Sequence, residues 1–145
     1  MKTNPYRPGA LLLALLCASF PLASAAPATA LAGPVPRHHH RHTAEDITRF
    51  LTGFYGDHGP SDQDRRRLVS RQLKHKQAHL PDTDVLLCSR STPLHISVGT
   101  ATVAQSAGVG WATVTTHWAE GTTDFTAYVR LDSRPIELDD VICAG

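Results

Sequence analysis

From Thr43 onward, the apolar residues recur with the period of an α-helix. Four of them stand at positions i, i+3, i+4 and i+7 and therefore share one helix face: Ile47, Phe50, Leu51 and Phe54. Thr43 and Asp46 stand three residues apart and resemble a capping box, and Gly56 can end a helix in the left-handed conformation. The pattern predicts an amphipathic helix between Thr43 and Gly56.

A second helical pattern follows the turn expected at residues 57–60. Ser61 and Asp64 repeat the capping signal, and acidic residues occupy the first turn, where the helix dipole favours them. A thin apolar stripe then continues toward Pro81, which cannot extend a helix: Val69, Leu73 and Leu80. We expect a single helix from Ser61 to about His79.

Beyond Val85 the apolar residues follow a period of two, which is typical of strands. Residues 110–118, 125–131 and 136–142 predict three strands, with a tight turn at Glu120-Gly121 between the first two. Residues 94–103 are interrupted at Gly99 and form either one bent strand or two. The pattern predicts an α+β domain, with two N-terminal helices packed on an antiparallel sheet of about four strands. One face of this sheet should be covered and the other more polar.

Residues 1–25 have the layout of a secretory signal peptide. Lys2 and Arg7 precede an uncharged apolar run over 10–20, and Ala23-Ser24-Ala25 matches a small-x-small cleavage site. The run is shorter than the roughly 20 residues that a membrane-spanning helix needs. We therefore expect export to the periplasm or the medium with cleavage near Ala25. An uncleaved anchor and lipidation at Cys17 are the alternatives.

Residues 26–42 are rich in alanine, proline and histidine and cannot bury an apolar face. This composition predicts a disordered tether, followed by one domain over 43–145. Cleavage would remove Cys17 and leave Cys88 and Cys143. We expect these two to form a disulfide, because free thiols are prone to oxidation outside the cytosol; two separate buried thiols are the alternative.

The charge of the chain is nearly balanced. Loss of Lys2 and Arg7 changes the net charge from +1 to −1, so nothing in the total charge indicates a nucleic acid or an anionic membrane as partner. Six basic residues crowd one segment, however: Arg65, Arg66, Arg67, Arg71, Lys74 and Lys76. The first interpretation of such a cluster is a solvated helix face. The alternative is a surface that docks an envelope protein or an anionic ligand, since arginine binds carboxylates and phosphates in a bidentate manner.

Histidines occur in two local patterns that resemble metal sites. His38, His40 and His42 would share one side of an extended segment, but a tether cannot hold ligands in a fixed geometry. His75 and His79 have the spacing of a zinc-binding helix, with Lys76 in place of the glutamate base. We interpret both patterns as solvated and expect no metal or other cofactor.

Three short segments resemble a bacterial exported domain of unknown function, the YbjP/YqhG type. They are residues 84–88 (DVLLC), residues 138–143 (LDDVIC) and the aromatic positions of the first helix, Phe50-Leu51 and Phe54-Tyr55. The resemblance implies a cystatin-like or nuclear-transport-factor-2-like fold, in which helices pack in the concavity of a curved antiparallel sheet. It also implies export and the disulfide, and it supplies no catalytic residues.

Some proteins with such folds use a hollow between helices and sheet for acid–base chemistry. Six residues of this chain could line one: Tyr55, His95, His117, Trp118, Asp139 and Asp140. Asp139 and Asp140 point to opposite faces if they lie in a strand. The hypothesis that follows from the whole sequence is a small exported, non-enzymatic binding module. An immunity or inhibitor protein against a cell-wall hydrolase or toxin is the first alternative, and a pocket enzyme is the second.

Overall fold

Helix α1 (Ala44–Tyr55) begins at the capping box that the sequence predicts. The Thr43 hydroxyl accepts a hydrogen bond from the Asp46 amide (3.1 Å), and the Asp46 carboxylate accepts one from the Thr43 amide (3.0 Å). These hydrogen bonds hold the pKa of Asp46 below its usual value, because they favour the charged carboxylate. Gly56 ends the helix with a φ of 52°, so the first predicted helix is confirmed.

The second predicted helix is divided in two. Helix α2 (Asp62–Arg67) and helix α3 (Arg71–Ala78) are separated by the linker 68–70, and the Ser70 hydroxyl caps α3 by accepting from the Leu73 amide (3.1 Å). The Ser70 amide donates to the Leu138 carbonyl (2.9 Å), and the Leu138 amide donates to the Leu68 carbonyl (2.7 Å). The expectation of a continuous helix was wrong because the linker pairs with a strand. Leu80, expected in the apolar stripe, is 47% exposed.

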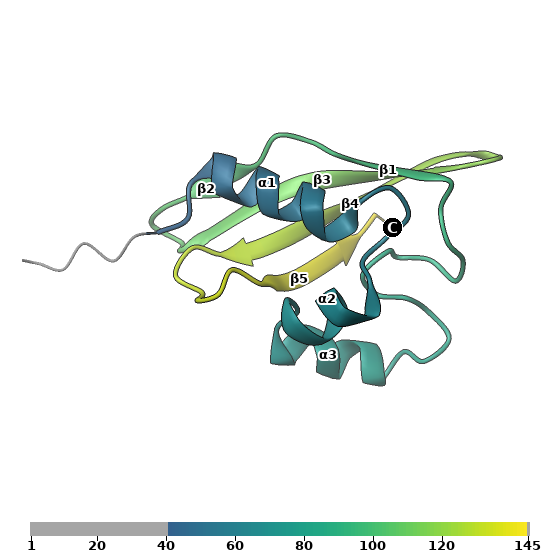
Figure 1. The fold of residues 1–145 in the computed structure, drawn as a ribbon, viewed down its shortest axis with the longest axis horizontal. Coiled ribbons are helices and arrows are strands. Elements are labelled where there is room, and N and C mark those ends of the chain that lie inside the picture. The colour runs from purple at the N-terminus through teal and green to yellow at the C-terminus, as the bar shows by residue number, and fades with distance from the viewer. Residues whose placement is uncertain (1–40, 145) are drawn as a thin grey trace, which may run out of the picture. The chain divides into compact units, whose positions relative to one another are not determined.

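The structure, a computed structural model, describes residues 41–144 of the 145-residue chain. Within this range the chain forms an α+β domain with an open, five-stranded, wholly antiparallel sheet (Figure 1). The strands are β1 (His95–Val98), β2 (Thr102–Ala104), β3 (Val109–Trp118), β4 (Gly121–Arg130) and β5 (Leu138–Cys143). The order is β1-β3-β4-β5, and β2 also pairs with β3, so residues 94–103 form two strands.

The two faces of the sheet differ in burial. Helix α1 contacts β1 and β3 and buries Ile47 and Leu51 completely (Figure 1). On the same side, β3 and β4 carry buried residues at alternate positions: Ala112, Val114, Thr116, Phe125, Ala127 and Val129. On the other side no residue of these strands is fully buried. We call that side the open face; its central rows are the directly opposed pairs Trp111–Tyr128, Thr113–Thr126 and Thr115–Asp124. The predicted covered and polar faces are both present.

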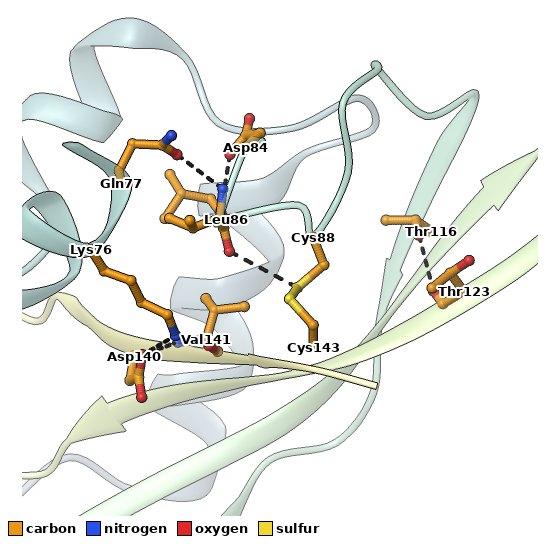
Figure 2. The surroundings of a disulfide bond; sticks show 11 residues. Lys76, Gln77, Asp84, Leu86, Cys88, Thr116, Thr123, Asp140, Val141 and Cys143 are labelled. Atoms are coloured by element: carbon orange, nitrogen blue, oxygen red, sulfur yellow. Dashed lines mark hydrogen bonds and ion pairs between the residues drawn. A yellow bond between two sulfur atoms is a disulfide. The ribbon is translucent and has the colours of Figure 1, made fainter. Parts of the chain in front are cut away.

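Cys88 and Cys143 form the expected disulfide, with their Cα atoms 5.6 Å apart (Figure 2). The bond attaches the loop after α3 to the end of β5. Gln77 of α3 supports the same loop, since its side-chain oxygen accepts from the Val85 amide (2.9 Å) and its side-chain nitrogen donates to the Thr83 carbonyl (2.8 Å). The segment between α3 and β1 is therefore attached to β5 by the disulfide and to α3 by Gln77, without regular secondary structure of its own.

Gly110 permits the close approach of α1 to the sheet. A Cβ at this position would overlap Ile47 Cδ1 and come within 3.2 Å of the Thr102 carbonyl oxygen. We expect Gly110→Ala to lower the free energy of unfolding by about 1–3 kcal/mol, the usual cost of overpacking. Gly53→Ala on α1 is the control, because the new methyl group meets no atom within 4 Å. This control should gain roughly 0.5–1 kcal/mol from helix propensity. Urea unfolding of both variants measures the difference, and equal effects would contradict the role of Gly110.

The disulfide should act as one cross-link rather than as two independent side chains. It closes a sequence separation of 55 residues. The loop-entropy model predicts a loss of at most about 4 kcal/mol when it is opened. Cys88→Ser, Cys143→Ser and the double variant should therefore lower the melting temperature by similar amounts, since partners in contact are not additive. Reduced wild-type protein should melt near the variants. Additive losses in the double variant would show that each cysteine stabilises the fold separately.

Candidate functional site

The side chains of three of the six predicted docking residues bind other groups of the same domain. Arg65 pairs with Asp84 at 2.6 Å and donates to the Pro60 carbonyl, and both side chains of the ion pair are mostly buried. Lys74 donates to the Arg66 carbonyl (2.7 Å). Lys76 binds the Asp140 carboxylate (3.0 Å) and the Val141 carbonyl (2.7 Å), as Figure 2 shows. These residues join α2 and α3 to their surroundings.

The other three predicted docking residues are exposed. Arg66 and Arg67 lie in the last turn of α2, and Arg71 begins α3. None of them forms an ion pair with the residues that the structure describes. Arg71 lines a depression together with Glu137, so a carboxylate lies near this end of the cluster. Arg66, Arg67 and Arg71 are therefore the members of the cluster whose side chains make neither an ion pair nor a hydrogen bond with a described residue.

The histidine patterns are engaged in local contacts. The His75 and His79 rings are 4.2 Å apart between centroids, and His79 Nδ1 is hydrogen-bonded to the His75 carbonyl oxygen (2.8 Å). His42 Nε2 lies 2.8 Å from the Ser133 carbonyl oxygen, and the His42 amide donates to Leu131. His38 and His40 lie outside the described residues. Within 41–144, no group of three or more histidine, cysteine or acidic side chains is placed to hold a metal ion.

Five of the six residues expected to line a pocket lie on different parts of the sheet, and the sixth, Tyr55, lies on α1. His95 and His117 are neighbours on the open face, with ring centroids 5.5 Å apart. Trp118 belongs to the helix-covered side, where its Nε1 donates to Thr116 (3.2 Å). Asp139 and Asp140 lie on β5 at the opposite edge of the sheet from β1. The structure therefore brings together only the two histidines of this set.

Tyr55, the last member of that set, is completely buried on α1. Its ring contacts Phe54 and Phe125 with centroids 5.1 and 5.6 Å away. Its hydroxyl has no hydrogen-bond partner among the described residues. Burial raises the pKa of Tyr55 far above its usual value, and the charge of Asp84 adds to this effect. The phenol therefore stays protonated and serves as part of the core.

Two polar depressions adjoin each other at the end of β4. The first, about 420 Å³, is lined by residues including Arg41 and Gly108, and the second, about 380 Å³, by residues including Ser70 and Glu137. Both include Arg130, Asp132 and Asp139. Arg130 and Asp132 bind each other (3.3 Å), which lowers the pKa of Asp132. The charges in these depressions are mixed, so they favour no single class of ligand.

The open face brings two aromatic side chains together. Trp111 and Tyr128 are directly opposed across β3 and β4, with ring centroids 6.2 Å apart and an interplanar angle of 33°. Both side chains are partly exposed. Neither the Trp111 indole N–H nor the Tyr128 hydroxyl makes a hydrogen bond with a described residue. Large aromatic side chains with free polar groups are typical of binding surfaces.

The rows on one side of the aromatic pair carry hydroxyl groups, and the row on its other side is Val109–Arg130. Thr113 and Thr126 face each other next to the rings, and Thr115 faces Asp124 in the following row. The side chains of these four residues make no hydrogen bond within the described part of the chain. Sequence reasoning separated the two faces of these strands but did not select Trp111 and Tyr128. The signal for them was their position on the polar side of alternating strands, where a core residue is not expected.

Comparison with protein-family models, curated proteins and solved structures finds no match for this chain. No helix within residues 41–144 is long and apolar enough to cross a membrane. The candidate site therefore depends on geometry alone, and the open face is chosen because two partly exposed aromatic side chains are directly opposed on it.

The basic residues should separate into structural and surface groups. Arg65→Gln removes one partner of an ion pair that is less than one-third exposed and leaves Asp84 uncompensated. We expect a loss of about 1–3 kcal/mol in the free energy of unfolding. The matched variant Arg67→Gln should change it by less than about 0.5 kcal/mol, because Arg67 is exposed. Urea unfolding tests the contrast, and a neutral Arg65→Gln would show that its ion pair does not support the fold.

Proposed function

We propose that this protein is a small exported binding module that acts through the open face of its sheet. The observation that carries the proposal is the Trp111–Tyr128 pair, which is partly exposed and lies beside a row of free threonine hydroxyl groups. Neither ring belongs to the buried core, which α1 fills on the other side of the sheet. Solvent-accessible aromatic groups instead provide contact area to a ligand at a small cost in side-chain entropy.

We also propose that the protein is exported and that it belongs to the YbjP/YqhG type, which its sequence resembles. The disulfide supports export, because such bonds persist in oxidising compartments. The position of α1 along one face of an antiparallel sheet supports the cystatin-like arrangement (Figure 1). The separation of Tyr55, the two histidines and the two aspartates favours binding over pocket catalysis. The exposed arginines Arg66, Arg67 and Arg71 are a second surface on which docking can be tested.

Site-specific photocrosslinking in the host cell tests which surface binds. A benzophenone side chain is placed at Thr113 or Thr126 on the open face, at Arg67 on the basic surface, and at Glu45 on α1 as a control. All four positions are at least partly exposed. Benzophenone inserts into C–H bonds and therefore reports protein and carbohydrate neighbours alike. We expect adducts of the exported protein from Thr113 and Thr126, and few from Arg67 or Glu45.

Two outcomes would contradict the proposal. Adducts that form only from Arg67 would move the binding surface to the basic cluster. Equal yields from all four positions, or none from any of them, would show that the open face has no specific partner. Thermal melting of each labelled protein verifies that the substitution leaves the fold intact.

A further inference from the structure

The central rows of the open face present two kinds of group in a regular array. The Trp111–Tyr128 row supplies flat aromatic surface, and the Thr113–Thr126 row next to it supplies hydroxyl groups. Strand geometry fixes the spacing, because residues two apart on one strand lie on the same face, about 6–7 Å from each other. A ligand that covers both rows must therefore offer apolar surface beside groups that form hydrogen bonds.

The charge pattern restricts the ligand further. The charged groups next to the aromatic pair are paired within the domain. Asp140, opposed to Tyr128, binds Lys76, and Arg130, in the row on the other side of the pair from the threonines, binds Asp132. Asp124, in the row after the threonines, forms no ion pair with a described residue. An unpaired carboxylate repels anionic ligands and accepts hydrogen bonds from hydroxyl or amide donors. The face therefore suits an uncharged ligand rich in hydroxyl groups.

A protein partner fits this surface less well. The fully buried core of a protein interface is mainly apolar. On this face, however, the two rows that follow Trp111 and Tyr128 consist of threonines and Asp124. The exposed Ile142 is opposed to Thr126 and is the large aliphatic side chain in that row. A second copy of the chain would place Asp124 against polar or acidic groups of the same face. The pattern does not favour pairing of two sheets.

We infer that the open face binds an uncharged glycan chain, with sugar rings stacked on Trp111 and Tyr128. A pyranose ring has an apolar face of C–H groups and a rim of hydroxyl groups, so it matches an aromatic surface that lies beside hydroxyls. The free Trp111 N–H and Tyr128 hydroxyl can bind sugar oxygens at the edges of the stack, and Thr113, Thr126 and Asp124 can bind the rim. This inference rests on the proposed function and names the ligand class of the same surface.

The two tryptophans make a direct test possible. The chain has two, and they lie on opposite sides of β3: Trp111 on the open face, and Trp118 on the helix side with its N–H bound to Thr116. Each gives its own indole N–H signal in a ¹H–¹⁵N NMR spectrum, and a Trp111→Phe variant assigns them. The mature protein is titrated with two neutral hexasaccharides, one of β-1,4-linked glucose and one of β-1,4-linked N-acetylglucosamine. An anionic oligogalacturonate serves as the comparison.

We expect at least one neutral hexasaccharide to shift the Trp111 signal while the Trp118 signal stays in place. Trp111→Ala and Tyr128→Ala should each weaken binding about tenfold or more, as truncation of an aromatic anchor usually does. Trp118→Phe, the matched control on the other side of the sheet, should retain full affinity. The selective shift is measured on wild-type protein, so the test stands even where an alanine variant does not fold.

Three results would overturn the glycan inference. They are no shift of Trp111 with either neutral hexasaccharide at millimolar concentration, equal shifts of both tryptophans, and stronger binding of the anionic oligosaccharide. The proposed function is tested separately by crosslinking. Protein adducts from Thr113 and Thr126 without glycan binding would keep the binding module and reject the ligand, whereas neither adducts nor glycan binding would reject both.

Discussion

Strand β5 is the element on which the arrangement of this domain depends. Its start pairs through Leu138 with the linker between α2 and α3, its middle accepts the Lys76 ammonium at Asp140 and Val141, and its end carries Cys143 of the disulfide (Figure 2). The backbone groups at a sheet edge need partners, and here a short linker and a lysine provide them. The same contacts attach both short helices and the irregular loop to the sheet.

The attachment of the two short helices at the β5 edge affects how the two faces of the sheet are covered. Helix α3 contributes Leu73 to the core at the β5 side, while α1 covers one face of the sheet at β1 and β3. No helix covers the centre of the other face, and most of its side chains are hydroxyl, aromatic and charged groups, with Val109 and Ile142 as aliphatic members. Burial on one side of an antiparallel sheet is sufficient for stability, so the second side is available for other roles. The Trp111–Tyr128 pair lies on that second side.

The basic cluster shows how a charged segment can serve two purposes. Arg65, Lys74 and Lys76 bind groups of the domain, whereas Arg66, Arg67 and Arg71 extend outward. The difference follows from helix geometry, because residues on one side of α2 and α3 meet the loop and β5 while their neighbours do not. A count of positive charges therefore does not separate the basic side chains that bind the domain from those that have no partner in it.

The sequence by itself determined the local features: the capping box at Thr43, the apolar face of α1, the alternation of β3 and β4, and the pairing of Cys88 with Cys143. These features depend on residues close in sequence or, for the cysteines, on elimination of other partners. Only the tertiary structure decided the break at residues 68–70, because Leu138, which pairs with the linker, is about 70 residues away. It also decided the partners of Arg65 and Lys76 and the direct opposition of Trp111 and Tyr128. The register between β3 and β4 places these two aromatic residues opposite each other. The alternation of apolar and polar residues within each strand does not by itself specify that register.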